Sequence, residues 1–143
     1  MISLNLQNRC LATALLVLGS ATVTFSTAGT AAPYSVAPVT EYMQLPKFCW
    51  GHFNDDLRGE EFYIPRCGVG TNHYCDGLLS LQRAKKARDV GQKKGLLAAA
   101  KRDTLYTKGW IEREGFVGTC FITSHVQQTL QEIELLHQIY HIK

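Results

Sequence analysis

Apolar residues recur at helical spacing in three stretches of the second half of the chain. The stretches run from about 72 to 88, from about 94 to 113 and from 123 or 124 onward, and each places its apolar side chains on one helix face. Short connections make consecutive helices antiparallel, so the pattern predicts an all-α fold, a helix hairpin with a third helix in a three-helix bundle. The apolar positions are Tyr74, Cys75, Leu78, Leu79, Leu81, Ala84 and Ala87 in the first stretch, Leu97, Ala100, Thr104 and Ile111 beside Leu96, Ala99, Tyr106 and Trp110 in the second, and Val126, Leu130, Ile133, Leu136 and Tyr140 in the third.

Polar residues and glycines mark where these helices begin and end. Asn72 is predicted to be the N-cap of the first helix, because its short side chain can accept a bond from an unpaired N–H of the first turn. Ser124 and Gln127 form a capping-box pattern at the start of the third helix. Gly115 is predicted to follow the second helix as its C′ residue. Gly77 lies inside the first helix, where it indicates close approach of another backbone.

The first half of the chain lacks this periodicity. Residues 1–31 have a weakly basic start, an apolar core and small residues, which is the layout of a secretory signal peptide cleaved after Ala28 or Ala31. An uncleaved membrane anchor is the alternative interpretation. Residues 32–47 carry three prolines and are predicted to form an extended arm. The helical domain then spans 48–143 and opens with an irregular loop rich in aromatic residues.

The mild net charge and the predicted export both argue against nucleic acid as a partner. Arg9 is the one charged residue of the predicted signal peptide, so the rest of the chain has 14 basic and 12 acidic residues and a net charge of +2. This balance is too mild for a nucleic-acid-binding protein, and export argues against nucleic acid as well. We therefore expect a periplasmic or secreted protein that does not bind nucleic acid.

Four cysteines remain after the predicted signal peptide, and an even number in a small exported domain predicts two disulfides. The first and third helices run in the same direction, so their N-terminal ends meet, and Cys120 is expected to pair with a cysteine at the start of the first helix. The preferred pairing is Cys67 with Cys120 and Cys49 with Cys75. The alternative, Cys75 with Cys120 and Cys49 with Cys67, stays open, and a bond between Cys49 and Cys120 is the least favoured.

A basic cluster surrounds the predicted turn between the first and second helices. Antiparallel packing should gather its charges at the tip of the hairpin, where they could bind an anionic surface such as lipid headgroups, an acidic polysaccharide or an acidic partner protein. The alternative is a solvated helix end whose cations interact favourably with the helix dipole. The predicted partner-binding residues are Arg83, Lys85, Lys86, Arg88, Lys93, Lys94, Lys101 and Arg102.

Catalytic and metal-binding chemistry has weaker support. Cys49, His52, His73 and Cys75 could form a tetrahedral zinc set, although their spacing matches no standard finger and an oxidising compartment would consume the thiols. Four acidic residues could supply a carboxylate pair for glycoside hydrolysis, but acids in a polar loop are usually just solvated. We therefore expect no cofactor and assign no catalytic residue. The four acidic residues are Asp55, Asp56, Glu60 and Glu61.

The segment NHYCDGLLSLQRAKKA, followed by GLLAAAKRDTLYTKGW and a third helix, resembles the helix-hairpin units of tetratricopeptide-repeat-like proteins exported by proteobacteria. The resemblance implies a binding or scaffolding role and identifies no catalytic residue. The chain is thus expected to be an exported cell-envelope interaction or accessory module that binds an envelope protein or an anionic surface, with peripheral membrane contact as one form. The alternative is a small metal-binding protein or hydrolase that uses the cysteine and histidine end. The most specific positions of the resemblance are His73, Tyr74, Cys75, Gly77 and Leu78.

Overall fold

The computed structural model describes residues 36–59, 61–62 and 67–141, and the predicted signal peptide lies outside this range. All regular structure in the described part is helical, as the apolar pattern predicts. None of the described helices is long and apolar enough to cross a bilayer. The α-helices are α1 (Val39–Tyr42), α2 (Trp50–Phe53), α3 (Asn72–Lys86), α4 (Val90–Arg113) and α5 (Thr123–Ile139), and short 3₁₀ turns are η1 (Lys47–Cys49), η2 (Asp55–Leu57) and η4 (Val69–Thr71).

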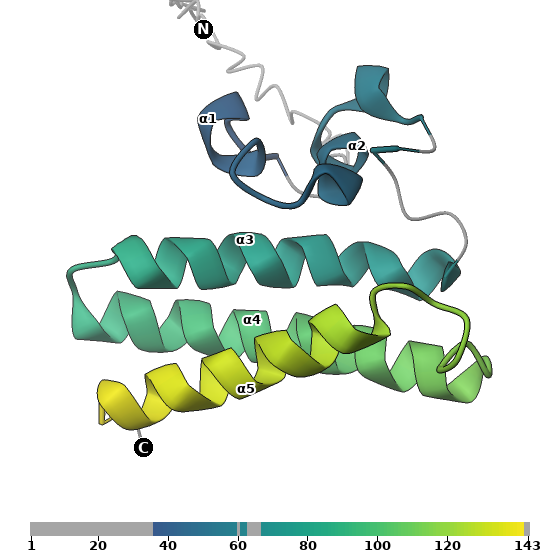
Figure 1. Ribbon diagram of the computed structural model, residues 1–143. Helices are drawn as coiled ribbons and strands as arrows, with labels where there is room; N and C mark the ends of the chain where they lie inside the picture. Colours follow the sequence, from purple (N-terminus) through teal and green to yellow (C-terminus); the bar gives the residue numbers. More distant parts are fainter. Residues whose placement is uncertain (1–35, 60, 63–66, 142–143) are drawn as a thin grey trace, which may run out of the picture. The chain divides into compact units, whose positions relative to one another are not determined.

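Helices α3 and α4 form an antiparallel hairpin, and α5 packs along α4 (Figure 1). Helix α4 therefore contacts both of the other long helices. Leu97, Ala100 and Ile111 are buried on one face of α4, together with Thr104 and Thr107. The adjoining face is covered only in part, because Tyr106 is exposed.

The buried side chains fall into two clusters, one at each end of the hairpin. The larger cluster includes Tyr74, Ile122 and both disulfides, and it lies where the aromatic loop meets the starts of α3 and α5. The smaller cluster contains Leu81, Ala84, Leu97, Ala100 and Ile133, with Leu96, Leu136 and Tyr140 packed against it. Both ends of the hairpin thus have an apolar core, and the disulfides belong to the larger one.

Two disulfides connect segments that are distant in the sequence. Cys49 bonds Cys75 and Cys67 bonds Cys120, with Cα–Cα distances of 5.4 and 5.2 Å. The preferred pairing is therefore confirmed, and the alternative pairing is wrong. The first bond attaches the aromatic loop to the first turn of α3, and the second attaches the segment before α3 to the segment before α5.

The prediction of an extended arm is wrong for Val39–Tyr42, which form the single turn α1. Pro38 has φ −58° and ψ 145°, so it can precede this turn without entering it. Tyr42 and Leu45 lie three residues apart and are both buried, which a turn permits and an extended chain, whose side chains alternate, does not. The Trp50 Nε1–H donates to the Leu45 carbonyl at 3.0 Å, and this bond helps to fix the turn.

The predicted side-chain caps of α3 and α5 are also wrong. Asn72 lies inside α3, whose N-cap is Thr71, and Ser124 lies inside α5, whose N-cap is Ile122. Neither cap residue uses its side chain to bind the first turn. Buried neighbours determine both starts, because Thr71 and Ile122 are fully enclosed in the core.

Helix α4 begins at Val90 rather than near residue 94, because the Asp89 carboxylate accepts a hydrogen bond from the Gln92 N–H at 2.6 Å. At its other end, Gly115 has φ +74° and the Phe116 N–H donates to the Ile111 carbonyl at 2.9 Å. This geometry is a Schellman motif, which confirms Gly115 as the C′ residue.

Candidate interaction site at the hairpin tip

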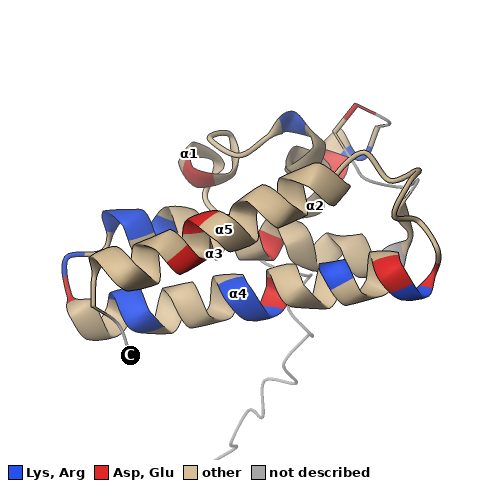
Figure 2. Cartoon of the chain, turned by 60° about the horizontal axis from the view of Figure 1, so that its bottom comes forward, with Lys and Arg blue, Asp and Glu red and all other residues tan. Residues whose placement is uncertain are grey.

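The turn between α3 and α4 carries half of the predicted basic cluster, namely Lys86, Arg88, Lys93 and Lys94. We call residues 86–94 the hairpin tip, and Figure 2 shows blue segments on both sides of this turn. Lys101 and Arg102 do not lie there, since Lys101 is about 16 Å along the axis of α4 from Val90. The prediction that all eight cations gather at the tip is therefore wrong for Lys101 and Arg102, whereas Arg83 and Lys85 lie in the last turn of α3, next to the tip.

Four of the eight cations have carboxylate partners. Arg83 binds the Glu41 carboxylate of α1 at 2.6 and 2.7 Å. Lys85 and Lys101 pair with Glu132 and Glu134 of α5. Arg102 pairs with its neighbour Asp103, and this hydrogen bond and the Asp103 charge raise the pKa of Arg102 above its usual value. These four side chains join elements of the fold or form local pairs, so their charge is largely compensated.

The other four cations belong to the tip and have no carboxylate partner among the described residues. Lys86 donates to the amide oxygen of Gln44 at 2.7 Å, which leaves its charge uncompensated. The Lys93 ammonium lies 3.6 Å from the centroid of the Tyr140 ring, a cation–π contact with the end of α5. Arg88 and Lys94 are exposed. Asp89 is the acidic residue of the tip, and its carboxylate caps α4.

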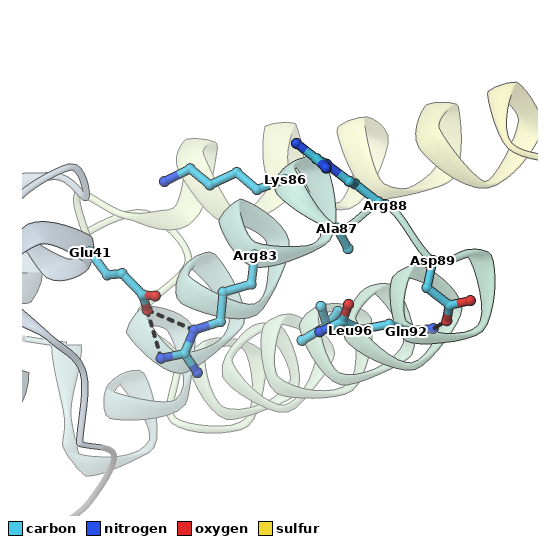
Figure 3. Close-up of a pocket in the computed structure, with 8 residues that line it drawn as sticks. All are labelled: Glu41, Arg83, Lys86, Ala87, Arg88, Asp89, Gln92 and Leu96. Atoms are coloured by element: carbon cyan, nitrogen blue, oxygen red, sulfur yellow. Dashed lines mark hydrogen bonds and ion pairs between the residues drawn. The ribbon is translucent and has the colours of Figure 1, made fainter.

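A shallow hollow of about 770 Å³ lies between the tip and α1. In Figure 3, Glu41 reaches Arg83 from α1, while Lys86 and Arg88 extend from the end of α3. Ala87 and Leu96 supply apolar lining. The hollow thus offers cationic groups beside an ion pair, an arrangement suited to an anionic group.

Gln44, Glu41 and Tyr140, which contact the basic residues, were not predicted as part of the site. Glu41 and Gln44 belong to the segment that the prolines assigned to an extended arm. Tyr140 was predicted as a core position, and the structure shows that its ring also binds Lys93. The sequence does contain one signal for these contacts. Tyr42 and Leu45 are spaced by about one helical turn, and when both are buried, Glu41 and Gln44 lie on the outer side of the turn.

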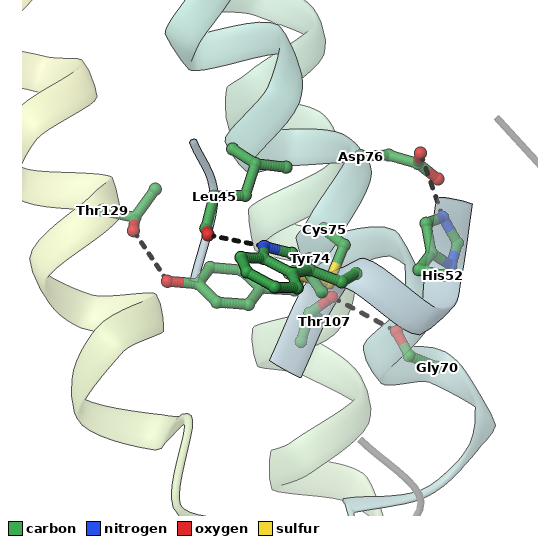
Figure 4. Close-up of a disulfide and its surroundings, with 10 residues drawn as sticks. Leu45, His52, Gly70, Tyr74, Cys75, Asp76, Thr107 and Thr129 are labelled. Atoms are coloured by element: carbon green, nitrogen blue, oxygen red, sulfur yellow. Dashed lines mark hydrogen bonds and ion pairs between the residues drawn. A yellow bond between two sulfur atoms is a disulfide. The ribbon is translucent and has the colours of Figure 1, made fainter. Parts of the chain in front are cut away.

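The cysteine and histidine end does not assemble the predicted zinc set. Cys49 and Cys75 are bonded to each other, so neither sulfur is a thiolate ligand. The His52 Nε2 lies 3.1 Å from the Asp76 Oδ1 (Figure 4). The His73 ring packs instead against the Tyr106 ring, with centroids 4.2 Å apart. Among the residues that the structure describes, no group of three or more His, Cys, Asp or Glu residues could hold a metal ion.

The four acidic residues of the proposed hydrolase pair are not arranged as a site in the described part. Asp55 pairs with Arg58 at 2.7 Å, and Glu61 pairs with Lys47 at 3.3 Å. Asp56 is exposed, and Glu60 lies outside the described residues. The described acids therefore lie on a solvated surface rather than in a cleft.

Comparison with protein-family models, with curated proteins and with solved structures found no match for this chain. The resemblance to exported tetratricopeptide-repeat-like proteins therefore stays a prediction.

Proposed function

We propose that this protein is an exported cell-envelope interaction module that docks an anionic partner through its hairpin tip. The observation that carries the proposal is the set of cations at the tip that lack carboxylate partners among the described residues. They are Lys86, Arg88, Lys93 and Lys94.

The helix dipole does not account for this arrangement. Lys86 lies at the C-terminal end of α3, where a cation is favourable, and Arg88 follows closely. Lys93 and Lys94 lie near the N-terminal end of α4, where the dipole disfavours a cation by about 0.3–1 kcal/mol. A role in binding explains why cations occur on both sides of the turn.

The disulfides support the export part of the proposal. Two disulfides in a small domain are typical of proteins that fold outside the reducing cytoplasm. The layout of residues 1–31 indicates the secretory route. The helix hairpin agrees with the proposed relationship to exported tetratricopeptide-repeat-like proteins, whose role would be binding or scaffolding.

A polyanion matrix tests whether the tip is the anion-binding surface. The tip variant combines Lys86→Gln, Arg88→Gln, Lys93→Gln and Lys94→Gln, and the measurement is the salt concentration that elutes the protein from an immobilised sulfated polysaccharide. Each cation near an anionic surface contributes about 1 kcal/mol, so the affinity of the tip variant for the matrix at low salt should fall by at least about a hundredfold. The tip variant should therefore elute at a lower salt concentration than the wild type.

The control variant removes the same number of charges elsewhere. Its four residues pair with carboxylates on the exposed surface, where such pairs contribute about 0–1 kcal/mol each to stability. The control should elute close to the wild type. Equal losses in the two variants would show that net charge, and not the tip, governs binding. The control changes are Lys47→Gln, Arg58→Gln, Lys101→Gln and Lys108→Gln.

A further inference from the structure

Exposed apolar side chains occur at the same end of the described domain as the four cations that have no carboxylate partner within it. Val90, the first residue of α4, is 64% exposed, and Leu135 and Ile139 of α5 are 54% and 56% exposed. Leu135 and Ile139 are four residues apart and lie on one face of the last turns of α5. The sequence predicts a turn around Val90 and gives no sign of an apolar surface there, so this exposure is a finding of the structure.

The contacts of α5 place its end beside the tip. Tyr140 lies against Lys93, and Leu136 and Tyr140 pack with Leu96 on the smaller core cluster. Figure 1 likewise shows α5 ending on the side where α3 turns into α4. Val90, which lies within the tip, and Ile139, which precedes Tyr140, therefore lie at the same end of the hairpin as the four cations.

We propose that the anionic partner of the tip is a lipid bilayer, whose headgroups bind the cations while Val90 and Ile139 enter the boundary of the acyl region. This inference rests on the proposed docking function and specifies its partner. Peripheral attachment of this kind combines electrostatic attraction to anionic lipids with burial of apolar side chains.

The composition of the tip favours a bilayer over an acidic protein. Three of the four tip cations are lysines, which are depleted in protein–protein interfaces. Clusters of basic residues are, in contrast, typical of surfaces that bind anionic headgroups. Long lysine side chains can also keep their ammonium groups at the headgroups while nearby apolar residues lie deeper.

Vesicles test the lipid partner, with the disulfide-bonded protein recovered from an exporting host. The apolar variant is Val90→Gln with Ile139→Gln, which changes no charge and keeps residues suited to a helix. Binding to vesicles of phosphatidylglycerol mixed with phosphatidylcholine should weaken by about tenfold, because the variant loses apolar burial. The rise in surface pressure of a monolayer of the same lipids should also be smaller.

Leu105→Gln with Val117→Gln is the matched control, since both residues are exposed and lie away from the tip. This control should bind vesicles as the wild type does. If the apolar variant keeps full affinity and full surface pressure, or if the wild type does not bind the vesicles, the lipid inference is wrong. If the tip variant still elutes from the polysaccharide at lower salt than its control, docking to another anionic partner remains supported. If the two variants elute alike, the docking function itself is wrong.

Discussion

At the scale of single residues, Tyr74 is the buried titratable group with the clearest energetic consequence. Its side chain is 2% exposed, and its hydroxyl is 2.9 Å from the Thr129 hydroxyl of α5. Burial raises the pKa of Tyr74 from its ordinary value of 10.0 to about 12, although the bond to Thr129 lowers it in part. The folded protein therefore keeps this phenol neutral over a pH range in which the unfolded chain ionises it.

We predict a loss of stability in alkali that depends on Tyr74. Below pH 10 the phenol is neutral in both states and contributes no pH dependence; between pH 10 and about 12 the unfolded state ionises first, so the free energy of unfolding falls. The fall should reach about 2–3 kcal/mol. Urea unfolding of wild type and Tyr74→Phe measures it, and the variant should lack this part of the alkaline slope.

At neutral pH the same substitution should destabilise the protein by about 1 kcal/mol, because it removes the hydrogen bond to Thr129. The difference between the two proteins should therefore shrink and reverse as the pH rises. If the free energies of unfolding of the wild type and of Tyr74→Phe change in parallel with pH up to pH 12, the raised pKa of Tyr74 is contradicted.

At the scale of helices, α3 and α4 approach closely at Gly77. A Cβ at this position would lie 2.9 Å from the Thr104 Oγ1 and 3.2 Å from the Ala100 carbonyl oxygen, which confirms the close approach predicted from the sequence. Thr104 cannot yield freely, because its hydroxyl donates to that carbonyl at 2.7 Å.

Alanine substitutions at two helical glycines should therefore have opposite effects. We predict that Gly77→Ala lowers the free energy of unfolding by about 1–3 kcal/mol, because overpacking outweighs the better helix propensity of alanine. A Cβ at Gly95 of α4 would meet no neighbour within 4 Å in the described part of the chain, so Gly95→Ala should stabilise by about 0.5–1 kcal/mol. Denaturant unfolding of both variants checks the contrast, and a stabilised Gly77→Ala would refute the tight contact.

The three long helices α3, α4 and α5 could be predicted from the sequence because each one buries a periodic apolar face, which is a local signal. The predicted starts of α3 and α5 agree with the structure to within one residue, but their predicted caps do not, because Thr71 and Ile122 precede these helices as parts of the core and not as capping side chains. The position of α1 likewise depends on burial of Tyr42 and on the Arg83–Glu41 pair, whose partners lie 42 residues apart.

The basic residues of the candidate site could be predicted from the sequence, but their carboxylate partners could not. Sequence spacing identifies the basic residues, whereas the partners of Lys85 and Lys101 come from α5. The distinction between compensated and uncompensated cations therefore needs the packed helices. The exposure of Ile139 has the same origin, because neighbours in space decide which of the apolar residues near the end of α5 are covered.

At the scale of the whole described domain, stability is distributed unevenly between the two ends of the hairpin. Both disulfides and the larger apolar cluster lie at one end, and the smaller cluster supports the tip. Surfaces that must adapt to a partner are commonly the less stable parts of a protein. The proposed docking surface lies at the end that no disulfide stabilises among the described residues.

Removing each disulfide should affect a different part of the chain. The Cys67–Cys120 bond spans 53 residues and the Cys49–Cys75 bond spans 26, so replacing the first pair with serine should cost more. Each replacement should lower the free energy of unfolding by about 2–5 kcal/mol, and loop entropy should separate the two losses by about 0.6 kcal/mol.

In the Cys49→Ser, Cys75→Ser variant, hydrogen exchange should accelerate mainly in η1 and α2, because Tyr42, Leu45 and the Glu41–Arg83 pair still hold α1 on α3. Equal acceleration throughout α4 and α5 would instead show that this bond stabilises the whole bundle and not only the aromatic loop.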